Sequence, residues 1–411
     1  MGELIATAES DPVLAFIELG LGLGRHIDGL VDAYYGPPAI KERIDAAPVT
    51  APIQLAADAR SLLSALDAGA GPPDLDPNRR RYLRAQVSGL LTVASKLAGD
   101  PISYADEVES CYGIRPTMEP EDVFEAAHRR LDEALPGNGS HTGNGSLAER
   151  LIAWREAQAV PVDKLAAAID SLAEDLRERT DRLFGLPDGN HIDFELVTDQ
   201  PWSGFNYYLG DLRSRVAINT DLPVLSTVLP HLVAHEAFPG HHTENCLKEV
   251  GLTRRRHFQE ESIFCVGTPQ CLLAEGLADL GLEIVVPGGA ENRAAMAAEH
   301  FRSLGVPFDA DTAAVVAEAS DGLGKVRGNA ALLLHEEGRP VEEAIAYLAR
   351  WGLLPERRAA KAIEFLTDPT WRAYITCYLE GLPLCRSFVG GDPARFRRLL
   401  SEQLLPGDLA S

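Results

Sequence analysis

The stretch HEAFPGHH, residues 235–242, follows the apolar run LPHLVA (229–234) and contains three histidines and a carboxylate within eight residues. A helix that carries adjacent His and Glu, with more His one or two turns later, is how zinc hydrolases bring imidazole ligands and a general base together. We therefore expect a metal site here, with the rest of the chain built around it.

The spacing of the histidines departs from the usual zinc helix, in which two histidines four residues apart point at one metal. Here Pro239 occupies that position, so the second ligand must be His241 or His242. If Pro239-Gly240 bulges out as a two-residue insertion, His241 takes the place of the usual ligand. In a straight helix, His242 would share the face of His235 but lie about 10 Å along the axis. We favour His241 and keep His242 as the alternative.

A catalytic zinc usually has three protein ligands and one position open to water. Glu275 is the best candidate for the third ligand, because it lies in the otherwise apolar segment LLAEGLAD (272–279), where an unpaired acid is costly to bury. Glu236 is the expected general base. Asp279, one turn after Glu275, is expected to accept a hydrogen bond from a ligand histidine and so to orient it. His231 is expected to lie behind the ligands or to pack in the core, and not to bind the metal.

Composition narrows the class of protein further. The chain has 411 residues, of which 61 are acidic and 38 basic, giving a formal charge of −23. This charge repels phosphate backbones and anionic membrane surfaces, so we expect neither a nucleic-acid nor a membrane partner. The six cysteines form no CxxC pair and should be buried free thiols.

The first residues favour a cytoplasmic protein. Glu3, Glu9 and Asp11 interrupt the first dozen residues, which have neither a basic segment nor the continuous apolar core of a signal peptide. No run approaches the roughly 18 uninterrupted apolar residues that a membrane-spanning helix needs.

The periodicity of apolar residues predicts a mainly α fold. Helices are expected at residues 13–35, 40–66, 77–97, 119–135, 147–160, 162–183, 225–250, 258–285, 290–304, 310–335, 340–351, 354–366, 368–385 and 393–404. The chain divides into an N-terminal helical part (1–135), a flexible Gly/Asn/Ser loop (136–146) and a helical catalytic part (147–411).

A small β element is expected at residues 191–219, beside the metal site. Residues 191–197 and 213–219 alternate at period two and predict a small antiparallel sheet or hairpin. The aromatic, glycine-rich segment 201–210 between them suits either a packed turn or a wall of a substrate site.

The motif His-Glu-x-x-Pro-Gly-His-His, with a later Glu-Gly-x-Ala (275–278) and a Tyr-x-x-Gly (378–381), resembles the bacterial domain-of-unknown-function family 885. The resemblance covers roughly residues 201–381. That family is similar in layout to gluzincin metallopeptidases such as the Taq-type carboxypeptidases, which are mostly helical and have a deep cleft. The resemblance implies a zinc-dependent peptidase with ligands at His235, one of His241 and His242, and Glu275, and with Glu236 as the base.

Two late positions also match features of that family, namely His335, at the end of GNAALLLH (328–335), and Tyr378. If they face the metal, they would donate hydrogen bonds to the oxyanion of a tetrahedral intermediate. Packing is the alternative for both. Arg327 and Arg386 could receive a substrate carboxylate, although ordinary ion pairing is the favoured interpretation.

These features together predict a zinc-dependent hydrolase, specifically a carboxypeptidase- or oligopeptidase-like metallopeptidase with Zn²⁺ as cofactor. It would hydrolyse small peptides with metal-activated water and Glu236 as general base. One alternative is a metal-dependent hydrolase of another amide or ester, and the other is a non-catalytic metal-binding helical protein. Glu236 argues against the latter, because a structural zinc site needs no base beside a ligand.

Overall fold

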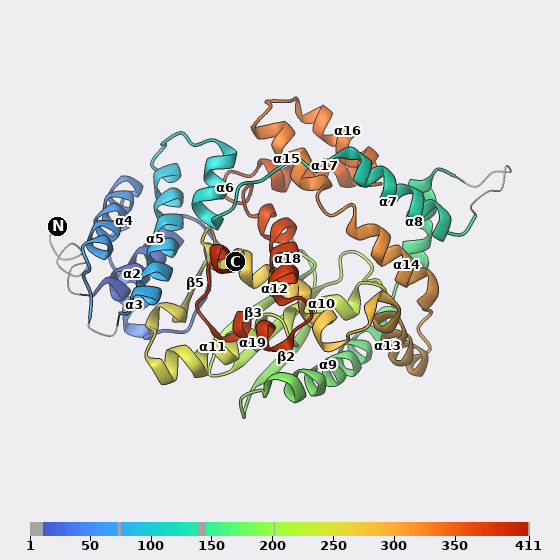
Figure 1. Ribbon diagram of the computed structural model, residues 1–411, viewed down its shortest axis with the longest axis horizontal. Helices are drawn as coiled ribbons and strands as arrows, with labels where there is room; N and C mark the ends of the chain where they lie inside the picture. The colour runs from blue at the N-terminus through green and yellow to red at the C-terminus, as the bar shows by residue number, and fades with distance from the viewer. Residues whose placement is uncertain (1–10, 73–74, 138–144, 201, 410–411) are drawn as a thin grey trace.

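The fold is mainly α, as predicted, and the computed structural model describes residues 11–72, 75–137, 145–200 and 202–409 (Figure 1). The helices are α2 (Pro12–Gly24), α3 (Pro38–Ala46), α4 (Pro52–Asp67), α5 (Pro77–Leu97), α6 (Tyr104–Tyr112), α7 (Glu121–Ala134), α8 (Leu147–Ala157), α9 (Val162–Phe184), α10 (Leu229–Glu236), α11 (His241–Lys248), α12 (Pro269–Val285), α13 (Gly289–Leu304), α14 (Ala310–Asp321), α15 (Val326–His335), α16 (Val341–Trp351), α17 (Glu356–Thr367), α18 (Ile375–Val389), α19 (Pro393–Ser401) and α20 (Pro406–Leu409). The strands are β1 (Val31–Tyr34), β2 (His191–Val197), β3 (Gly204–Gly210), β4 (Arg213–Asn219) and β5 (Ile263–Cys265).

Several predicted helices were too long because strands and breaks interrupt them. The helix expected at 13–35 ends at Gly24, within a glycine-rich segment, and β1 follows. The first part of the helix expected at 258–285 contains β5, which pairs antiparallel with β1, and the helix α12 begins only at Pro269. The helix expected at 310–335 divides into α14 and α15 around Gly322 and Gly324. Glycine is unfavourable inside a helix because its backbone loses more conformational freedom than that of other residues. The helices α2 and α14 therefore end at these glycine-rich segments.

The small β element lies where it was predicted, but its pairing was predicted wrongly. The two predicted strands are β2 and β4, and they run parallel, not antiparallel. The hairpin is formed instead by β3 and β4, through a tight turn at Asp211 and Leu212, both of which have positive φ (51° and 61°). The aromatic segment between the predicted strands is therefore largely a strand, β3, and the sheet order is β2-β4-β3.

Three large hydrophobic cores hold the helices together. The first contains residues of α9, α10, α12, α13, α18 and α19 and of the sheet. The second joins α2, α4 and α5 to β5, and the third joins α6 and Phe124 of α7 to α12 and α15–α18. The second and third cores thus combine residues from both sides of the predicted loop at 136–146, of which residues 138–144 lie outside the described part of the chain.

Helix α12 lies at the centre of the molecule, beside α18 (Figure 1). Two glycines allow the two helix backbones to touch: a Cβ added to Gly276 would lie 2.3 Å from the carbonyl oxygen of Gly381, and one added to Gly381 would lie 2.5 Å from that of Leu272. Gly276 follows Glu275 and Gly381 ends the Tyr-x-x-Gly motif. The glycines of both motifs therefore bring two segments of the predicted site together.

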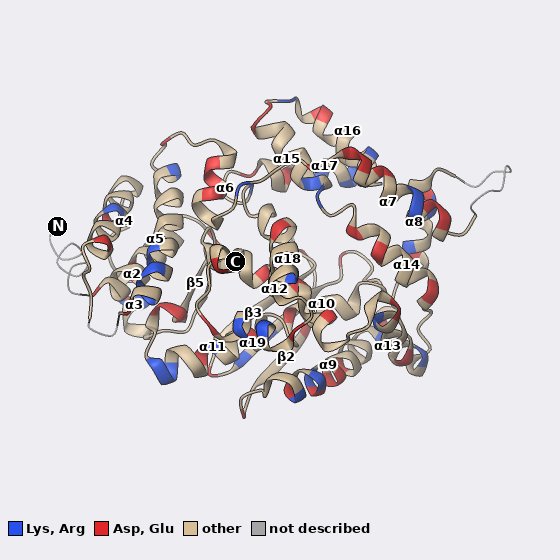
Figure 2. Ribbon diagram, viewed as in Figure 1, with Lys and Arg blue, Asp and Glu red and all other residues tan. Residues whose placement is uncertain are grey.

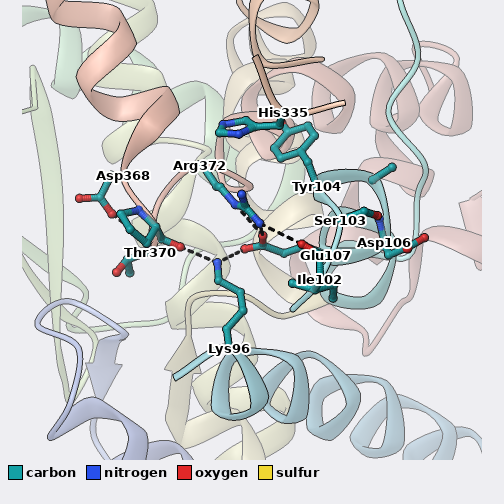
Figure 3. A network of polar contacts seen from close by, with 12 residues as sticks. Lys96, Ile102, Ser103, Tyr104, Asp106, Glu107, His335, Asp368, Thr370 and Arg372 are labelled. Atoms are coloured by element: carbon teal, nitrogen blue, oxygen red, sulfur yellow. Dashed lines mark hydrogen bonds and ion pairs between the residues drawn. The ribbon is translucent and has the colours of Figure 1, made fainter. Parts of the chain in front are cut away.

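A buried polar network ties the N-terminal helices to the turn that precedes α18 (Figure 3). Glu107 of α6 is 3 % exposed and accepts hydrogen bonds from Lys96 of α5 and from Arg372, whose Nε lies 2.8 Å from Glu107 Oε2. Lys96 also donates to the carbonyl oxygen of Pro369. The turn at residues 368–374 is thereby fixed against α5 and α6.

The distribution of charge, the state of the cysteines and the length of the helices were also considered from the sequence. Figure 2 shows acidic and basic residues intermixed on outer helices such as α7, α8 and α9. All six cysteines are free and buried, as predicted. Within the described ranges, every helix is too short or too polar to span a bilayer.

The contact between α12 and α18 predicts that Gly381→Ala destabilises the protein. The added methyl group would overlap backbone atoms of Leu272 and Gly276, and such overpacking costs about 1–3 kcal/mol of the free energy of unfolding. Urea unfolding of both proteins measures the loss. Gly407→Ala is the control, because its Cβ would meet no atom within 4 Å. Equal stabilities for the two variants would refute the argument.

The network at Glu107 predicts a larger loss for Glu107→Gln. Removing the carboxylate leaves Lys96 and Arg372 without their buried partner, which costs on the order of 3–5 kcal/mol. Thermal or urea unfolding measures this loss. Asp67→Asn, which breaks an ion pair of similar type between two side chains that are more than half exposed, should leave stability nearly unchanged.

Candidate metal centre

The HEAFPGHH stretch forms two helices with a sharp turn between them. α10 ends at Glu236, residues 237–240 turn, and α11 begins at His241. The amide of Gly240 donates to the carbonyl oxygen of Ala234 at 2.9 Å, and a Cβ at Gly240 would lie 1.9 Å from the carbonyl oxygen of His235. Only glycine fits so close to the preceding helix. The turn brings His241 back beside His235.

His235, His241 and Glu275 converge on one point. Nε2 of His235 lies 3.1 Å from Nε2 of His241 and 3.3 Å from Oε2 of Glu275, and the distance from His241 Nε2 to that oxygen is 3.9 Å. Ligands bonded to tetrahedral zinc at about 2.0–2.1 Å lie roughly 3.3 Å from each other. The two separations from His235 Nε2 are close to this value, and the third, between His241 and Glu275, is longer by about 0.6 Å.

The hydrogen bonds around these atoms fit a cation between them. Nδ1 of His235 lies 2.8 Å from Oδ1 of Asp279, and an ionised carboxylate only accepts, so Nδ1 carries the proton. In the neutral ring, the lone pair of Nε2 then faces Oε2 of Glu275, a buried oxygen without a hydrogen-bond partner among the described residues. Two facing acceptors repel each other unless a positive charge, either a second proton on His235 or a metal ion, lies between them, so the residues fit a metal ion.

The pKa shifts follow from the same arrangement. Burial by itself would lower the pKa of His235, but Asp279 and Glu275 outweigh this effect and hold it well above its ordinary value. Burial opposes ionisation of both acids, yet the close contacts with His235 and the charges of the nearby histidines lower both pKa values. The acids stay ionised, and the site attracts positive charge.

A tyrosine that the sequence analysis did not single out completes the shell around Glu275. The hydroxyl of Tyr374 donates to Oε1 of Glu275 at 2.6 Å, so one carboxylate oxygen is held by a tyrosine and the other is left for a ligand. Tyr374 precedes Tyr378 by one helical turn, and the shared face was the signal that could have indicated it. The Asp279 carboxylate also lies 3.5 Å from Nε2 of His231, consistent with a supporting role for His231.

Glu236 lies at the end of α10, next to His235, and is 6 % exposed. Burial raises the pKa of its carboxyl group, with Glu275 and Asp279 adding to the rise and the histidines opposing it. A carboxylate whose pKa is raised is a better proton acceptor. Its backbone carbonyl accepts a hydrogen bond from Nδ2 of Asn206 in β3, at 2.6 Å, so the sheet fixes the end of the helix.

Two further titratable groups lie within the electrostatic field of these acids. Solvent reaches 42 % of Tyr378, yet burial and the charges of Glu275 and Glu236 raise its pKa well above the ordinary value. Burial and the same two acids raise the pKa of Asp32, in β1, to about 7. Sequence analysis missed Asp32, whose only signal was a carboxylate within an apolar strand.

The structure does not bring His242 or His335 to the cluster. His242 is fully buried, and its Nδ1 lies 2.8 Å from Oγ of Ser214 in β4, so it ties α11 to the sheet. The structure therefore places His241, and not the alternative His242, beside His235 and Glu275. Nε2 of His335 lies 2.6 Å from the carbonyl oxygen of Leu366, and its ring stacks on Tyr104 beside the Glu107 network (Figure 3). The predicted oxyanion role of His335 has no support in this geometry, because α15 ends by turning that side chain toward α6.

Comparison with family models gives no match, and no curated protein is significantly similar to the chain. Solved structures do resemble it. A protein from Colwellia psychrerythraea described as a "putative lipoprotein" shares the fold with a TM-score of 0.50 at 15 % identity, over 85 % of this chain and 65 % of its own. A "putative lipoprotein of unknown function" from Shewanella oneidensis has a TM-score of 0.48 at 13 % identity, over 98 % of this chain and 82 % of its own.

The geometry predicts one zinc ion per chain, lost when a ligand is replaced. His241→Gln and Glu275→Gln each remove a donor atom and should abolish stoichiometric zinc in metal analysis and calorimetric titration. Asp279→Asn should lower the affinity by about 10- to 100-fold, because it orients His235 without binding the ion.

His242→Gln is the matched control for these titrations, since it replaces a neighbouring histidine that lies against Ser214. It should retain one zinc per chain. Loss of zinc in this variant together with its retention in His241→Gln would contradict the assignment.

Proposed function

We propose that this protein is a zinc-dependent metallopeptidase that hydrolyses small peptides. The observation that carries the proposal is the convergence of two imidazole nitrogens with a buried carboxylate oxygen that has no hydrogen-bond partner among the described residues. Two histidines and one glutamate form a ligand set typical of catalytic zinc in peptidases. Glu236 lies directly beside that set.

The chain's own residues have separate tasks in this proposal. A Zn²⁺ ion held by His235, His241 and Glu275 would polarise the scissile carbonyl and the attacking water. Glu236 accepts a proton from that water at its carboxylate and donates it to the leaving amine. The Tyr378 hydroxyl, whose high pKa keeps it protonated, donates a hydrogen bond to the carbonyl oxygen as charge develops there.

The sequence resemblance to the domain-of-unknown-function family 885, and through it to Taq-type carboxypeptidases, supports peptides as the substrate class. We extend the proposal to a cytoplasmic location, in keeping with six cysteines that are all free and buried. The same groups would also serve hydrolysis of an ester or of another amide, so compounds of both kinds belong in the assay.

Glu236→Gln tests the proposal. This variant keeps the shape of the side chain but cannot accept the proton, so kcat on a peptide library should fall by about 100- to 10,000-fold while one zinc remains bound. Treatment of the wild-type protein with a chelator should abolish the activity, and added zinc should restore it.

Glu299→Gln is the control, because this glutamate lies exposed on α13. It should hydrolyse the library at the wild-type rate. Wild-type protein purified without chelator and free of metal would refute the proposal, and so would full activity in Glu236→Gln.

A further inference from the structure

A cavity lies among the N-terminal helices, between α2, α3 and α4 and away from α12 (Figure 1). Its volume is about 50 Å³, and it is partly open to solvent. One water molecule needs about 10–15 Å³ of such a space. The cavity therefore has room for a small organic group, and no residue of the candidate metal centre lines it.

The walls of the cavity are largely apolar. They include side chains from all three helices, namely Leu19 of α2, Ile44 of α3, and Leu55 and Leu62 of α4. An alkyl chain placed against these walls would be removed from water, which is favourable. The lining therefore suits a ligand with a short apolar chain.

A buried carboxylate interrupts these apolar walls. Glu18 of α2 lines the cavity and is only 5 % exposed. Arg43 donates a hydrogen bond to its Oε1, and its Oε2 has no hydrogen-bond partner among the described residues. A buried carboxylate oxygen without a donor is costly, and a cationic donor compensates for its desolvation most strongly.

A second acid, Asp58 of α4, lines the same cavity. Its Oδ1 accepts a hydrogen bond from Nε2 of Gln54 at 2.9 Å, and its Oδ2 is buried without a partner in the described part of the chain. Each of the two acids therefore has one carboxylate oxygen without a donor. Both negative charges favour a positively charged group in the cavity.

The arginines near the cavity are engaged elsewhere. Nη1 of Arg25 lies 2.7 Å from the carbonyl oxygens of both Ile44 and Ala47, so this arginine ties the end of α2 to the end of α3. Arg43 binds the other oxygen of Glu18, with a side chain that is 56 % exposed. A compact ammonium group, which has three donor hydrogens, would supply the missing hydrogen bond from inside the cavity.

We propose that the cavity between α2, α3 and α4 binds a small ligand with a primary ammonium group and a short apolar chain. The ammonium group binds Oε2 of Glu18, and the chain lies against the leucine side chains. This inference does not rest on the proposed peptidase function. An alkylamine and a free amino acid with an apolar side chain both have these groups, and the experiment separates the two sources.

The test is calorimetric titration of the full-length protein with two matched pairs of compounds. Isoamylamine is compared with isoamyl alcohol, and leucine with ketoisocaproate, so that each pair differs in the ammonium group. In at least one pair the ammonium compound should bind about 10- to 100-fold more tightly, the range expected for a hydrogen bond between charged groups. The pair whose ammonium compound binds more tightly identifies the amine or the amino acid as the source.

Glu18→Gln should remove the preference for the ammonium compound, because it keeps the shape of the side chain without its charge. The exposed Arg43 stays hydrated in this variant, and thermal unfolding checks that the fold persists. Ala47→Leu should weaken binding by about 10-fold or more, because Ala47 is exposed and lines the cavity, which the larger side chain would fill.

Ala46→Leu is the matched control, since this neighbouring alanine is also exposed but does not line the cavity, and it should bind as wild type does. The two leucine variants also separate the cavity from the metal centre, where an amine could bind a metal ion. Wild-type protein without a preference for the ammonium compound in either pair overturns the inference. A folded Glu18→Gln variant that keeps the preference, or Ala47→Leu with wild-type affinity, overturns it as well.

Discussion

The burial of acids on α12 is the constraint on which the site depends. Nearly every residue of this helix is buried, yet it carries Glu275 and Asp279 at its centre. Buried carboxylates need hydrogen-bond donors or cations, because their desolvation is otherwise too costly. Asp279 accepts a hydrogen bond from His235 Nδ1, and Glu275 accepts one from the hydroxyl of Tyr374. The remaining Glu275 oxygen faces two imidazoles. One carboxylate oxygen of Glu275 therefore has no hydrogen-bond donor among the described residues, and a metal ion fits between it and the imidazoles.

Unusually close approaches between backbone segments bring these hydrogen-bond partners to the two acids. At the end of α10, the chain reverses over the carbonyl of His235, which only Gly240 permits, and His241 joins the cluster. Across the α12–α18 interface, Gly276 and Gly381 let two helices touch, so that Tyr374 reaches Glu275, 99 positions earlier in the chain. Glu107 then holds the turn before α18 against the N-terminal helices. The side chains of the candidate site are thus positioned by glycines and a buried ion-pair network.

Sequence patterns predicted the local features well. The helix at 77–97 has the same bounds in the structure, and the strands at 191–197 and 213–219 do too. The sequence patterns gave wrong predictions where the structure of a segment depends on pairing with another strand. Residues 31–34 form a strand because β5, far away in sequence, pairs with them, and β2 lies parallel to β4 because β3 takes the hairpin position. Neither pairing can be predicted from the apolar periodicity of a single segment.

The sequence by itself determined a mainly helical protein, and it indicated His235, His241, Glu236 and Glu275 as candidates, since residue type and spacing restrict what a histidine-rich helix and a buried acid can do. Only the tertiary structure separated His241 from His242, turned His335 toward Tyr104, and added Tyr374 and Asp32. It also showed that Arg386 pairs with Glu283, whereas Arg327 has no hydrogen-bond or ion-pair partner within the described chain. The reason is physical: which groups meet across helices depends on how closely backbones approach, and that is decided by packing between distant segments.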